Sequence, residues 1–299
     1  MEFLTKEKVA LALSDKRVAE LLPKRKRNSH KGTYGRAAIV GGSIEYMGAA
    51  YLSAAACLRA GAGYTTLFVP SEILPYYILK TPEILLKASN EGGRYALNEE
   101  IMRQVCEYDA VAYGMGMCVS LAVAEGAEYL LRHFKGRLIL DADGLNSLSV
   151  YKKEELASLL KNASCEVILT PHVKEFSRLS GLSVEDILQD EIGRARAFAK
   201  ENSVTVLLKN AASVIANGEE VAVSLTGNSG QAKAGSGDVL SGVLAGLCAQ
   251  GANVFEGGCA AAYLCGRAAE IAVKSVGEYS LTASDCIQNL GAAFLSVLG

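Results

Sequence analysis

The sequence of 299 residues contains no tryptophan and only three histidines, and no two of its eight cysteines form a C-x₂-C pair. It therefore lacks the ligand pattern of a structural zinc site, and we expect no metal ion held by protein side chains alone. Neither sign of charge is in excess, because 30 Lys and Arg stand against 32 Asp and Glu. That balance excludes nucleic acid and membrane surfaces as partners bound through a strongly basic face.

Long apolar segments are also missing. The longest uncharged run, residues 239–255, contains Ser, Gln, Asn and glycine, which predicts a buried helix and a loop rather than a membrane span. The N-terminus alternates charged and apolar residues and lacks the continuous apolar core of a signal peptide. Most cysteines have apolar neighbours, as buried thiols do in a reducing compartment. Together these features predict a folded cytoplasmic protein.

What the sequence does contain is an alternation of short apolar strands and helices. Strands are expected over residues 37–40, 64–69, 110–113, 138–140, 167–169 and 204–208, and helices over 47–60, 173–179, 184–200 and, with breaks near Gly251 and Gly277, from Asp238 to the end. Asn217-Gly218, between apolar residues 213–216 and 220–224, predicts a β-hairpin. This order predicts an α/β fold with a mostly parallel central sheet, helices on both faces and a late β-hairpin. We expect one domain over 1–299, whose N-terminal helical segment (1–22) carries a helix over 5–22.

Glycine and polar residues follow five of the expected strands. Because ligands bind beyond the carboxyl ends of such strands, these segments are expected to share one site. They are residues 41–43, 114–116, 141–144, 170–172 and 209–210.

The segment Gly235-Ser236-Gly237-Asp238 leads directly into a helix. Free N–H groups at a helix start, together with the helix dipole, form an anion site, and glycine lets a phosphate approach the backbone. Asp238 either accepts a proton from a substrate hydroxyl there or simply caps the helix. Gly242 and Gly246, four residues apart, predict close packing of this helix on a neighbour.

Three further groups have a structural and a functional interpretation. His172, in Thr170-Pro171-His172, is a ligand contact or a partly solvated residue at a helix start with Pro171 at its first position. Asp141 and Asp143 cap a helix beginning near Leu145 or organise water around a metal and phosphate. The basic run 24–31 is a solvated linker, or it places Lys31 near a bound anion.

These segments together resemble one family, the ADP- or ATP-dependent NAD(P)H-hydrate dehydratases of the ribokinase-like superfamily. The resemblance covers residues 25–295. Its motifs, in chain order, are HKGTYGRAAIVGGS (30–43), MGAAYLSAAACLRAGAG (47–63), GMG (114–116), DADGLN (141–146), TPHVKE (170–175), LLKNAASVI (207–215) and GNSGQAKAGSGDVLSG (227–242).

The resemblance implies a repair reaction on (6S)-hydrated NADH and NADPH. A nucleotide, with ADP expected rather than ATP, phosphorylates the ring hydroxyl, and phosphate then leaves as the double bond is restored. Asp238 would be the general base, and Mg²⁺ would bridge the nucleotide phosphates. The implied substrate contacts are Ala49, Gly116, His172 and Asp238, and the implied nucleotide contacts are Lys209, Asn210, Ala211, Ala212, Ser213, Gly235, Ser236 and Gly237. A separate NAD(P)H-hydrate epimerase is the implied functional partner. We also expect a homo-oligomer, with the Ala/Gly/Cys-rich residues 257–272 packed against another subunit.

The chain departs from the family pattern at two places that bear on these contacts. The usual GPGxG is replaced by Gly114-Met115-Gly116-Met117-Cys118, so a Cβ at Cys118 is expected to narrow access to the backbone. The usual LKG ends in Asn210, a residue that tolerates positive φ. Two other functions are open: a superfamily kinase for a vitamin-precursor alcohol, and a nucleotide-binding protein without activity.

Overall fold

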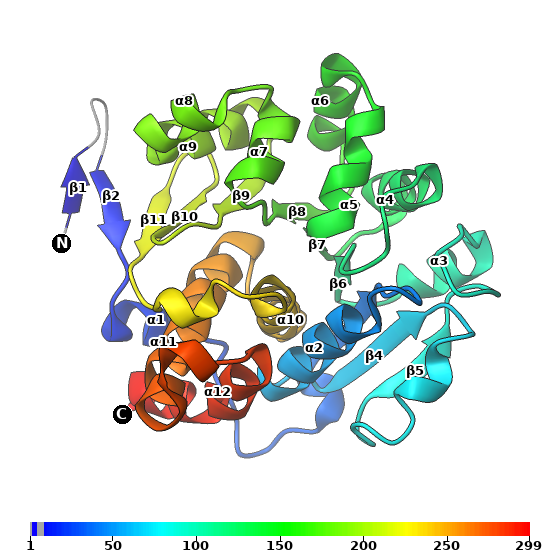
Figure 1. Ribbon diagram of the computed structural model, residues 1–299, viewed down its shortest axis with the longest axis horizontal. Coiled ribbons are helices and arrows are strands. Elements are labelled where there is room, and N and C mark those ends of the chain that lie inside the picture. The colour runs from blue at the N-terminus through cyan, green and yellow to red at the C-terminus, as the bar shows by residue number, and fades with distance from the viewer. Residues whose placement is uncertain (1, 5–8) are drawn as a thin grey trace.

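The computed structural model describes residues 2–4 and 9–299, and in these residues one 11-stranded sheet runs through the centre of the molecule (Figure 1). Its strand order is β1-β2-β11-β10-β9-β8-β7-β6-β3-β4-β5. The strands are β1 (Glu2–Leu4), β2 (Val9–Ala12), β3 (Arg36–Val40), β4 (Tyr64–Val69), β5 (Leu85–Ala88), β6 (Ala110–Tyr113), β7 (Arg137–Leu140), β8 (Glu166–Leu169), β9 (Thr205–Leu208), β10 (Ser213–Ala216) and β11 (Val221–Ser224).

The predicted mostly parallel sheet and late hairpin are confirmed. The strands from β5 across to β9 pair in parallel, whereas β9, β10 and β11 pair antiparallel. The parallel strands are buried on both faces, which is why they appear in the sequence as short, continuous apolar runs. Their carboxyl ends all lie at one edge of the sheet, and the loops that follow them form the candidate site.

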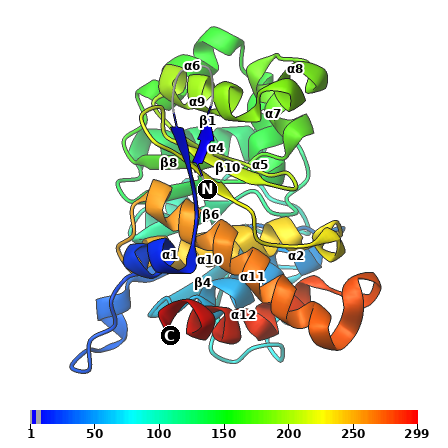
Figure 2. The same ribbon diagram turned by 90° about the vertical axis from the view of Figure 1, so that its left-hand side faces the viewer.

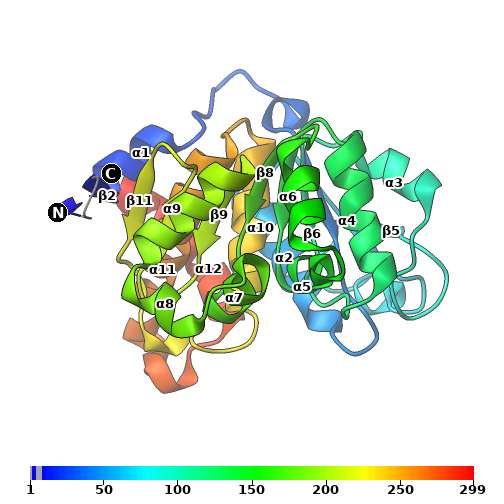
Figure 3. The same ribbon diagram turned by 90° about the horizontal axis from the view of Figure 1, so that it is seen from above.

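Helices cover both faces of the sheet. On one face lie α1 (Asp15–Leu21), α2 (Met47–Arg59), α10 (Ser236–Ala249), α11 (Val254–Ser280) and α12 (Ala283–Leu298). On the other lie α3 (Glu99–Val105), α4 (Leu121–His133), α5 (Ala142–Ser147), α6 (Lys153–Lys161), α7 (Val173–Ser180), α8 (Val184–Gln189) and α9 (Glu191–Asn202). Figure 2 shows the two layers on opposite sides of the sheet, and Figure 3 shows α4, α6, α7 and α9 lying across one of its faces.

Two helix predictions are wrong in part. The helix expected over 5–22 exists only as α1, since Val9–Ala12 is strand β2, and residues 5–8 lie outside the described residues. Strand β2 forms because the edge of β11 offers unpaired backbone groups, with Leu11 opposite Ala222. The helix expected over 184–200 is divided at Asp190, whose backbone is not helical and whose side chain accepts the N–H of Gly193 at the start of α9.

The expected close packing through Gly242 and Gly246 is confirmed. Both glycines of α10 face α2, where a methyl group on Gly242 would lie 2.1 Å from the carbonyl oxygen of Ser53 and one on Gly246 would lie 2.7 Å from that of Cys57. The Ser53 hydroxyl also donates to the carbonyl oxygen of Asp238 at 2.8 Å. Helix α2 therefore holds the start of α10, and with it Asp238, against the sheet.

A pair of glycine substitutions tests this packing. Gly242→Ala should destabilise the protein by about 1–3 kcal/mol, because the new methyl group meets backbone that cannot move away. Gly291→Ala, at an exposed position of α12 with no atom within 4 Å of the new Cβ, should stabilise it by about 0.5–1 kcal/mol. Urea unfolding midpoints measure both. Equal effects of the two substitutions would contradict the packing role of Gly242.

Residues 257–272 do not form the expected surface for another subunit. Most of this stretch of α11 is buried within the protomer, against α10, α12 and the sheet. Its small side chains serve close packing inside the chain, so they do not support an intersubunit contact. None of the helices described combines the length and the apolar character that crossing a membrane requires.

Candidate active site

A buried ion pair lies at the carboxyl edge of the sheet. The Lys209 ammonium, at the end of β9, lies 2.7 Å from Oδ1 of Asp141, which follows β7. The other carboxylate oxygen of Asp141 accepts a 2.6 Å hydrogen bond from Ser241 on α10, and Oδ1 also accepts the N–H of Ala142. This network joins two strand ends to the first turns of α10.

The loop after β8 is fastened to the same network. The pairing of β8 with β9 continues beyond both strands as a bridge between His172 and Lys209, and the Lys209 N–H donates to the carbonyl oxygen of Pro171. The buried Glu175 carboxylate lies 3.9 Å from the Lys209 ammonium. Burial alone would lower the pKa of Lys209, but the nearby carboxylates raise it, so this group stays charged.

His172 begins helix α7. Its Nδ1 accepts the N–H groups of Lys174 and Glu175, and the Glu175 carboxylate accepts the His172 N–H at 2.8 Å, so the two residues form a capping box. The cap is thus His172 itself, and not a residue before Pro171 as the sequence suggested. Burial lowers the pKa of the half-exposed imidazole, which keeps it neutral at neutral pH.

Asp238 is the third residue of α10 and does not cap it. The helix starts after Gly235, whose backbone φ of 97° is rarely adopted by residues other than glycine. No side chain caps the helix. The N–H groups of Gly237 and Asp238 enter none of the hydrogen bonds formed within residues 2–4 and 9–299. A methyl group on Gly237 would lie 3.3 Å from the Lys209 ammonium. The first turn of α10 therefore presents free donors beside a cation, which is the chemistry of an anion site.

The Asp238 carboxyl is a weaker acid than an ordinary aspartate. Burial raises its pKa to about 7, and the negative charges of Asp141 and Asp143 act in the same direction. The Lys209 ammonium opposes them. A carboxyl with a pKa near the working pH is suited to accept and release a proton in a reaction.

Asp143 contacts the loop formed by residues 114–118. The Cys118 N–H donates to Oδ2 of Asp143 at 2.9 Å. Cys118 has a φ of 64°, a left-handed conformation, and stands where the family pattern has glycine. Ala142, next to Asp143, also has a positive φ of 48°. Strained backbone of this kind gathers at functional sites, and here it turns the amide groups of the loop toward Asp143.

The implied substrate contacts lie together in part. A methyl group on Gly116 would lie 2.9 Å from both the Ala49 Cβ and the carbonyl oxygen of Tyr46, so Gly116 is packed against the start of α2. His172 lies two strands further along the sheet edge, beyond the loops after β6 and β7. These residues border the strand ends on both sides of Asp143.

Of the implied nucleotide contacts in residues 209–213, those after Lys209 lead away from Gly237. The Asn210 side chain donates to Glu191 on α9 and is exposed, and its backbone is not among the positive-φ residues, so the turn does not use the conformation expected there. Ala211 is exposed, while Ala212 lines a cavity of about 310 Å³ between β10, β11 and the start of α9. Ser213 begins β10. Only Lys209 of this segment reaches Gly237.

The basic run 24–31 lies away from these strand ends. The Arg25 guanidinium donates to the carbonyl oxygen of Gly61 and to Gln250, and it stacks on the Tyr34 ring at 3.8 Å. The Lys31 ammonium lies 4.8 Å from the centre of the Tyr64 ring, at the opposite edge of the sheet. Residues 24–31 are all exposed, which agrees with a solvated segment, although Arg25 docks it on the fold. The interpretation that places Lys31 near the anion site is corrected, because Lys31 lies at the opposite edge of the sheet.

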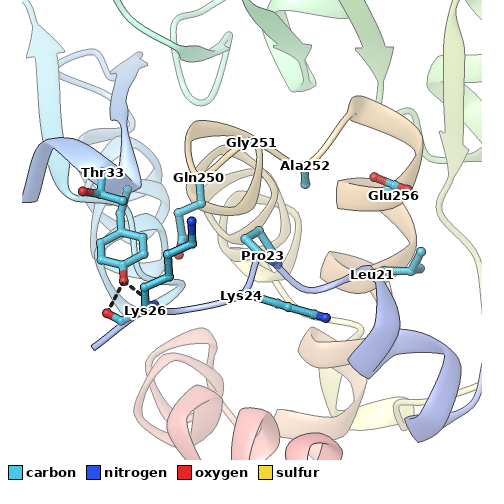
Figure 4. A pocket seen from close by; sticks show the side chains of 10 residues that line it. Leu21, Pro23, Lys24, Lys26, Thr33, Gln250, Gly251, Ala252 and Glu256 are labelled. Carbon is cyan, nitrogen blue, oxygen red and sulfur yellow. Dashed lines mark hydrogen bonds between the residues drawn. The ribbon is translucent and has the colours of Figure 1, made fainter. Parts of the chain in front are cut away.

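Figure 4 shows the pocket of about 350 Å³ that the basic run helps to line, with Lys24 and Lys26 from that run and Gln250 from the end of α10. Gln250 caps the C-terminal end of α10. A helix of 14 residues is about 21 Å long, so this pocket is separate from the site at Asp238.

Two members of the network were missed from the sequence. Ser241 binds Asp141, and Glu175 faces Lys209. In the sequence Glu175 follows His172 by three residues, and Ser241 follows Asp238 by three residues, a spacing that places each pair on one side of its helix. Within the described residues no three His, Cys, Asp or Glu side chains group as a metal site.

Known proteins share both the sequence and the architecture of this chain. A family model described as NAD(P)H-hydrate dehydratase matches residues 37–290. An ADP-dependent (S)-NAD(P)H-hydrate dehydratase of Neisseria meningitidis serogroup B is 37% identical over 256 residues, which are 85% of this chain and 82% of the relative. A bifunctional NAD(P)H-hydrate repair enzyme of Moorella thermoacetica is 35% identical over 274 residues, which are 90% of this chain. The chain spans about half (51%) of that relative's length.

A solved structure agrees with these matches. The crystal structure of an ADP/ATP-dependent NAD(P)H-hydrate dehydratase from Bacillus subtilis, co-crystallised with ATP and Mg²⁺, superposes with a TM-score of 0.82 at 26% identity. The superposition covers 96% of this chain and 99% of that one. The predicted ribokinase-like fold is confirmed.

Proposed function

Because the chain belongs to the NAD(P)H-hydrate dehydratase family, we propose that it converts (6S)-hydrated NADH and NADPH back to NADH and NADPH at the expense of a nucleotide. Hydroxide leaves carbon poorly, whereas phosphate leaves well. Transfer of a phosphoryl group to the ring hydroxyl therefore prepares the ring for elimination. ADP is the proposed donor, because the Neisseria relative is an ADP-dependent enzyme.

The observation that carries this proposal is the meeting of Asp238 with an anion site. The free N–H groups of Gly237 and Asp238 and the ammonium of Lys209 lie where a transferring phosphate would gather negative charge. The Asp238 carboxyl, at the same helix start, accepts the proton of the ring hydroxyl as its oxygen attacks phosphorus. Gly235 and Ser236 complete this phosphate loop, and Asn210 to Ser213 extend the nucleotide site from Lys209.

Mg²⁺ fits this site as an ion held by the phosphates of the nucleotide. The Asp141 oxygens are already bound to Lys209, Ala142 and Ser241, and the described residues offer no cluster of three ligands. We therefore assign the chain no metal ligand of its own. When bound through phosphate oxygens, the ion would neutralise charge on the nucleotide.

The direct test is the absorbance at 340 nm when the protein is added to hydrated NADH and Mg²⁺ with ADP or with ATP. A rise that depends on one nucleotide would establish the dehydration and identify the donor. No rise with either, despite a rise in Tm on adding nucleotide, would favour a kinase for another alcohol. No response to nucleotide would contradict both functions.

Activity should depend on pH through Asp238. The general base works only when ionised, so kcat/KM should fall as the pH drops below about 7, the pKa to which burial raises this carboxyl. The measurement is initial rates at 340 nm in buffers on both sides of that value. A constant kcat/KM from about pH 6 to 8 would contradict the assignment.

His172→Ala should raise KM for the hydrated dinucleotide and leave the nucleotide-induced rise in Tm unchanged. We place the half-exposed imidazole on the substrate side of the site, with its ring oriented by the N–H groups of α7. Asn at this position keeps a helix cap, so His172→Asn is the control that separates a lost contact from a lost cap. A lost response to nucleotide would instead place His172 at the nucleotide.

We propose a separate NAD(P)H-hydrate epimerase as the functional partner, since bifunctional repair enzymes are among the relatives. We also propose a cytoplasmic location, which the eight unpaired cysteines support. A homo-oligomer stays a prediction.

A further inference from the structure

The proposed dehydration releases two protons, and this inference rests on that function. The first comes from the ring hydroxyl during phosphoryl transfer. The second comes from carbon 5 of the ring, because a double bond between carbons 5 and 6 forms only if carbon 5 loses hydrogen as carbon 6 loses phosphate. A kinase needs one proton acceptor, whereas this reaction needs two. The question is which residue takes the second proton.

Two of the carboxylates at the sheet edge are already occupied. Both oxygens of Asp141 accept hydrogen bonds, and one of them is also ion-paired with Lys209. The buried Glu175 accepts the His172 N–H and faces the same ammonium. Neither presents a free, basic oxygen to a ligand. Glu45, at the outer rim, is paired with Arg94, which lowers its pKa.

His172 is not a proton acceptor either. Its Nδ1 accepts the two N–H groups at the start of α7, so in the neutral ring the hydrogen is on Nε2. The Nε2 atom lies 3.6 Å from Oε1 of Glu175. To take up a proton the imidazole would have to give up the helix cap. It is therefore arranged to donate a hydrogen bond.

Asp143 is the carboxylate that remains besides Asp238. It follows β7 in the loop that also holds Asp141, it is half-buried, and its charge is near enough to contribute to the electrostatics of Asp238. Its Oδ2 is held by the N–H of Cys118, in the loop that carries the implied substrate contact Gly116. We propose that Asp143 is the second catalytic base, which removes the proton from carbon 5 of the phosphorylated ring.

The step balances as an elimination. The lone pair of the ring nitrogen forms a double bond to carbon 6 while the bond from carbon 6 to the ester oxygen breaks, and its electron pair leaves with phosphate. The Asp143 carboxylate then takes the proton of carbon 5. The electrons of that C–H bond form the double bond between carbons 5 and 6, and the pair shared with nitrogen returns to it. No oxidant or reductant takes part.

The environment of Asp143 agrees with this role. Burial raises the pKa of its carboxyl above the ordinary value, while the amides of Cys118 and Met117 oppose that shift. The carboxylate is thus more basic than that of an exposed aspartate. The left-handed backbone of Cys118 is what directs its amide at the carboxylate and fixes the orientation of Asp143.

The test separates the two halves of the reaction. The protein is mixed with hydrated NADH, Mg²⁺ and the nucleotide that supports turnover, and nucleotide product and absorbance at 340 nm are followed together. Wild type should form both in equal amounts. Asp143→Asn should still form nucleotide product in the first turnover, while NADH formation falls by roughly 10²–10⁴ and a phosphate ester of the hydrate accumulates, visible by ³¹P NMR.

Controls keep the outcomes distinct. Asp186→Asn, on exposed α8, should behave as wild type. Asp143→Glu keeps a carboxylate and should release NADH at a rate between those of wild type and Asp143→Asn, which a merely structural role would not produce. If Asp143→Asn slows both products equally, or neither, the inference is wrong. If wild type forms neither product, it is the proposed function that fails.

Discussion

An Asp238→Asn variant should bind nucleotide as wild type does and lose turnover by roughly 10²–10⁴, the usual contribution of a general base. The amide has the shape of the carboxyl but cannot accept the hydroxyl proton. The N–H groups at the start of α10 and the Lys209 ammonium remain in place, so the anion site persists. Rates at 340 nm measure the loss, and the nucleotide-induced rise in Tm measures binding.

The same variant should be more stable than wild type above pH 7. Burial raises the pKa of Asp238 from 3.8 to about 7, so between these values the folded protein holds a proton that the unfolded chain has released. The stability of wild type therefore falls as the pH rises through this window, and the neutral amide escapes that loss. Near-wild-type turnover, or a stability difference that does not grow with pH, would contradict the environment described for Asp238.

Lys209→Met should destabilise the fold by about 3–5 kcal/mol, since it leaves charged carboxylates without their cation. Asp141 is almost fully buried, Glu175 nearly so, and Lys209 is the cation that faces both. Activity should fall as well, because the ammonium beside Gly237 is lost. Urea unfolding measures the first effect and the 340 nm assay the second.

A double variant is the control for this ion pair. Asp141→Asn in the Lys209→Met background removes the carboxylate that lost its partner. The double variant should therefore lose less unfolding free energy than the two single variants lose in sum. Activity should not recover, because the cation is still absent. Strict additivity of the two free energies would show that Lys209 and Asp141 do not interact as the 2.7 Å distance implies.

The interior strands could be predicted from sequence because burial on both faces makes them continuous apolar runs, as in β6 and β7. Strands β2 and β5 could not. Leu85–Ala88 is mostly exposed at the edge of the sheet, and Val9–Ala12 suits a helix equally well. Both owe their conformation to a neighbouring strand far away in the sequence, which local pattern does not register.

The site was predictable to the extent that strand ends define it. The parallel order placed Asp141, His172 and Lys209 at one edge, and they are in contact through one network. The side of the sheet was misjudged for Lys31, since a motif before β3 lies at the amino end of that strand. The link from Ser241 to Asp141 depends on how α10 sits over β7, a tertiary contact that no local spacing encodes.

The docking of the N-terminal segment has a consequence for how the chain is made. Arg25 is held by Gln250, 225 residues later, and Asp15 by Arg267, 252 residues later. At roughly 5–20 residues per second, a ribosome takes on the order of 10–50 s to deliver those partners. Until then α1 lacks its neighbours α11 and α12, and the side of α2 that meets α10 and α12 is uncovered. Helices α10, α11 and α12 thus cover this side of the core late in synthesis, and a chain released before they are made would expose the core to chaperones and proteases.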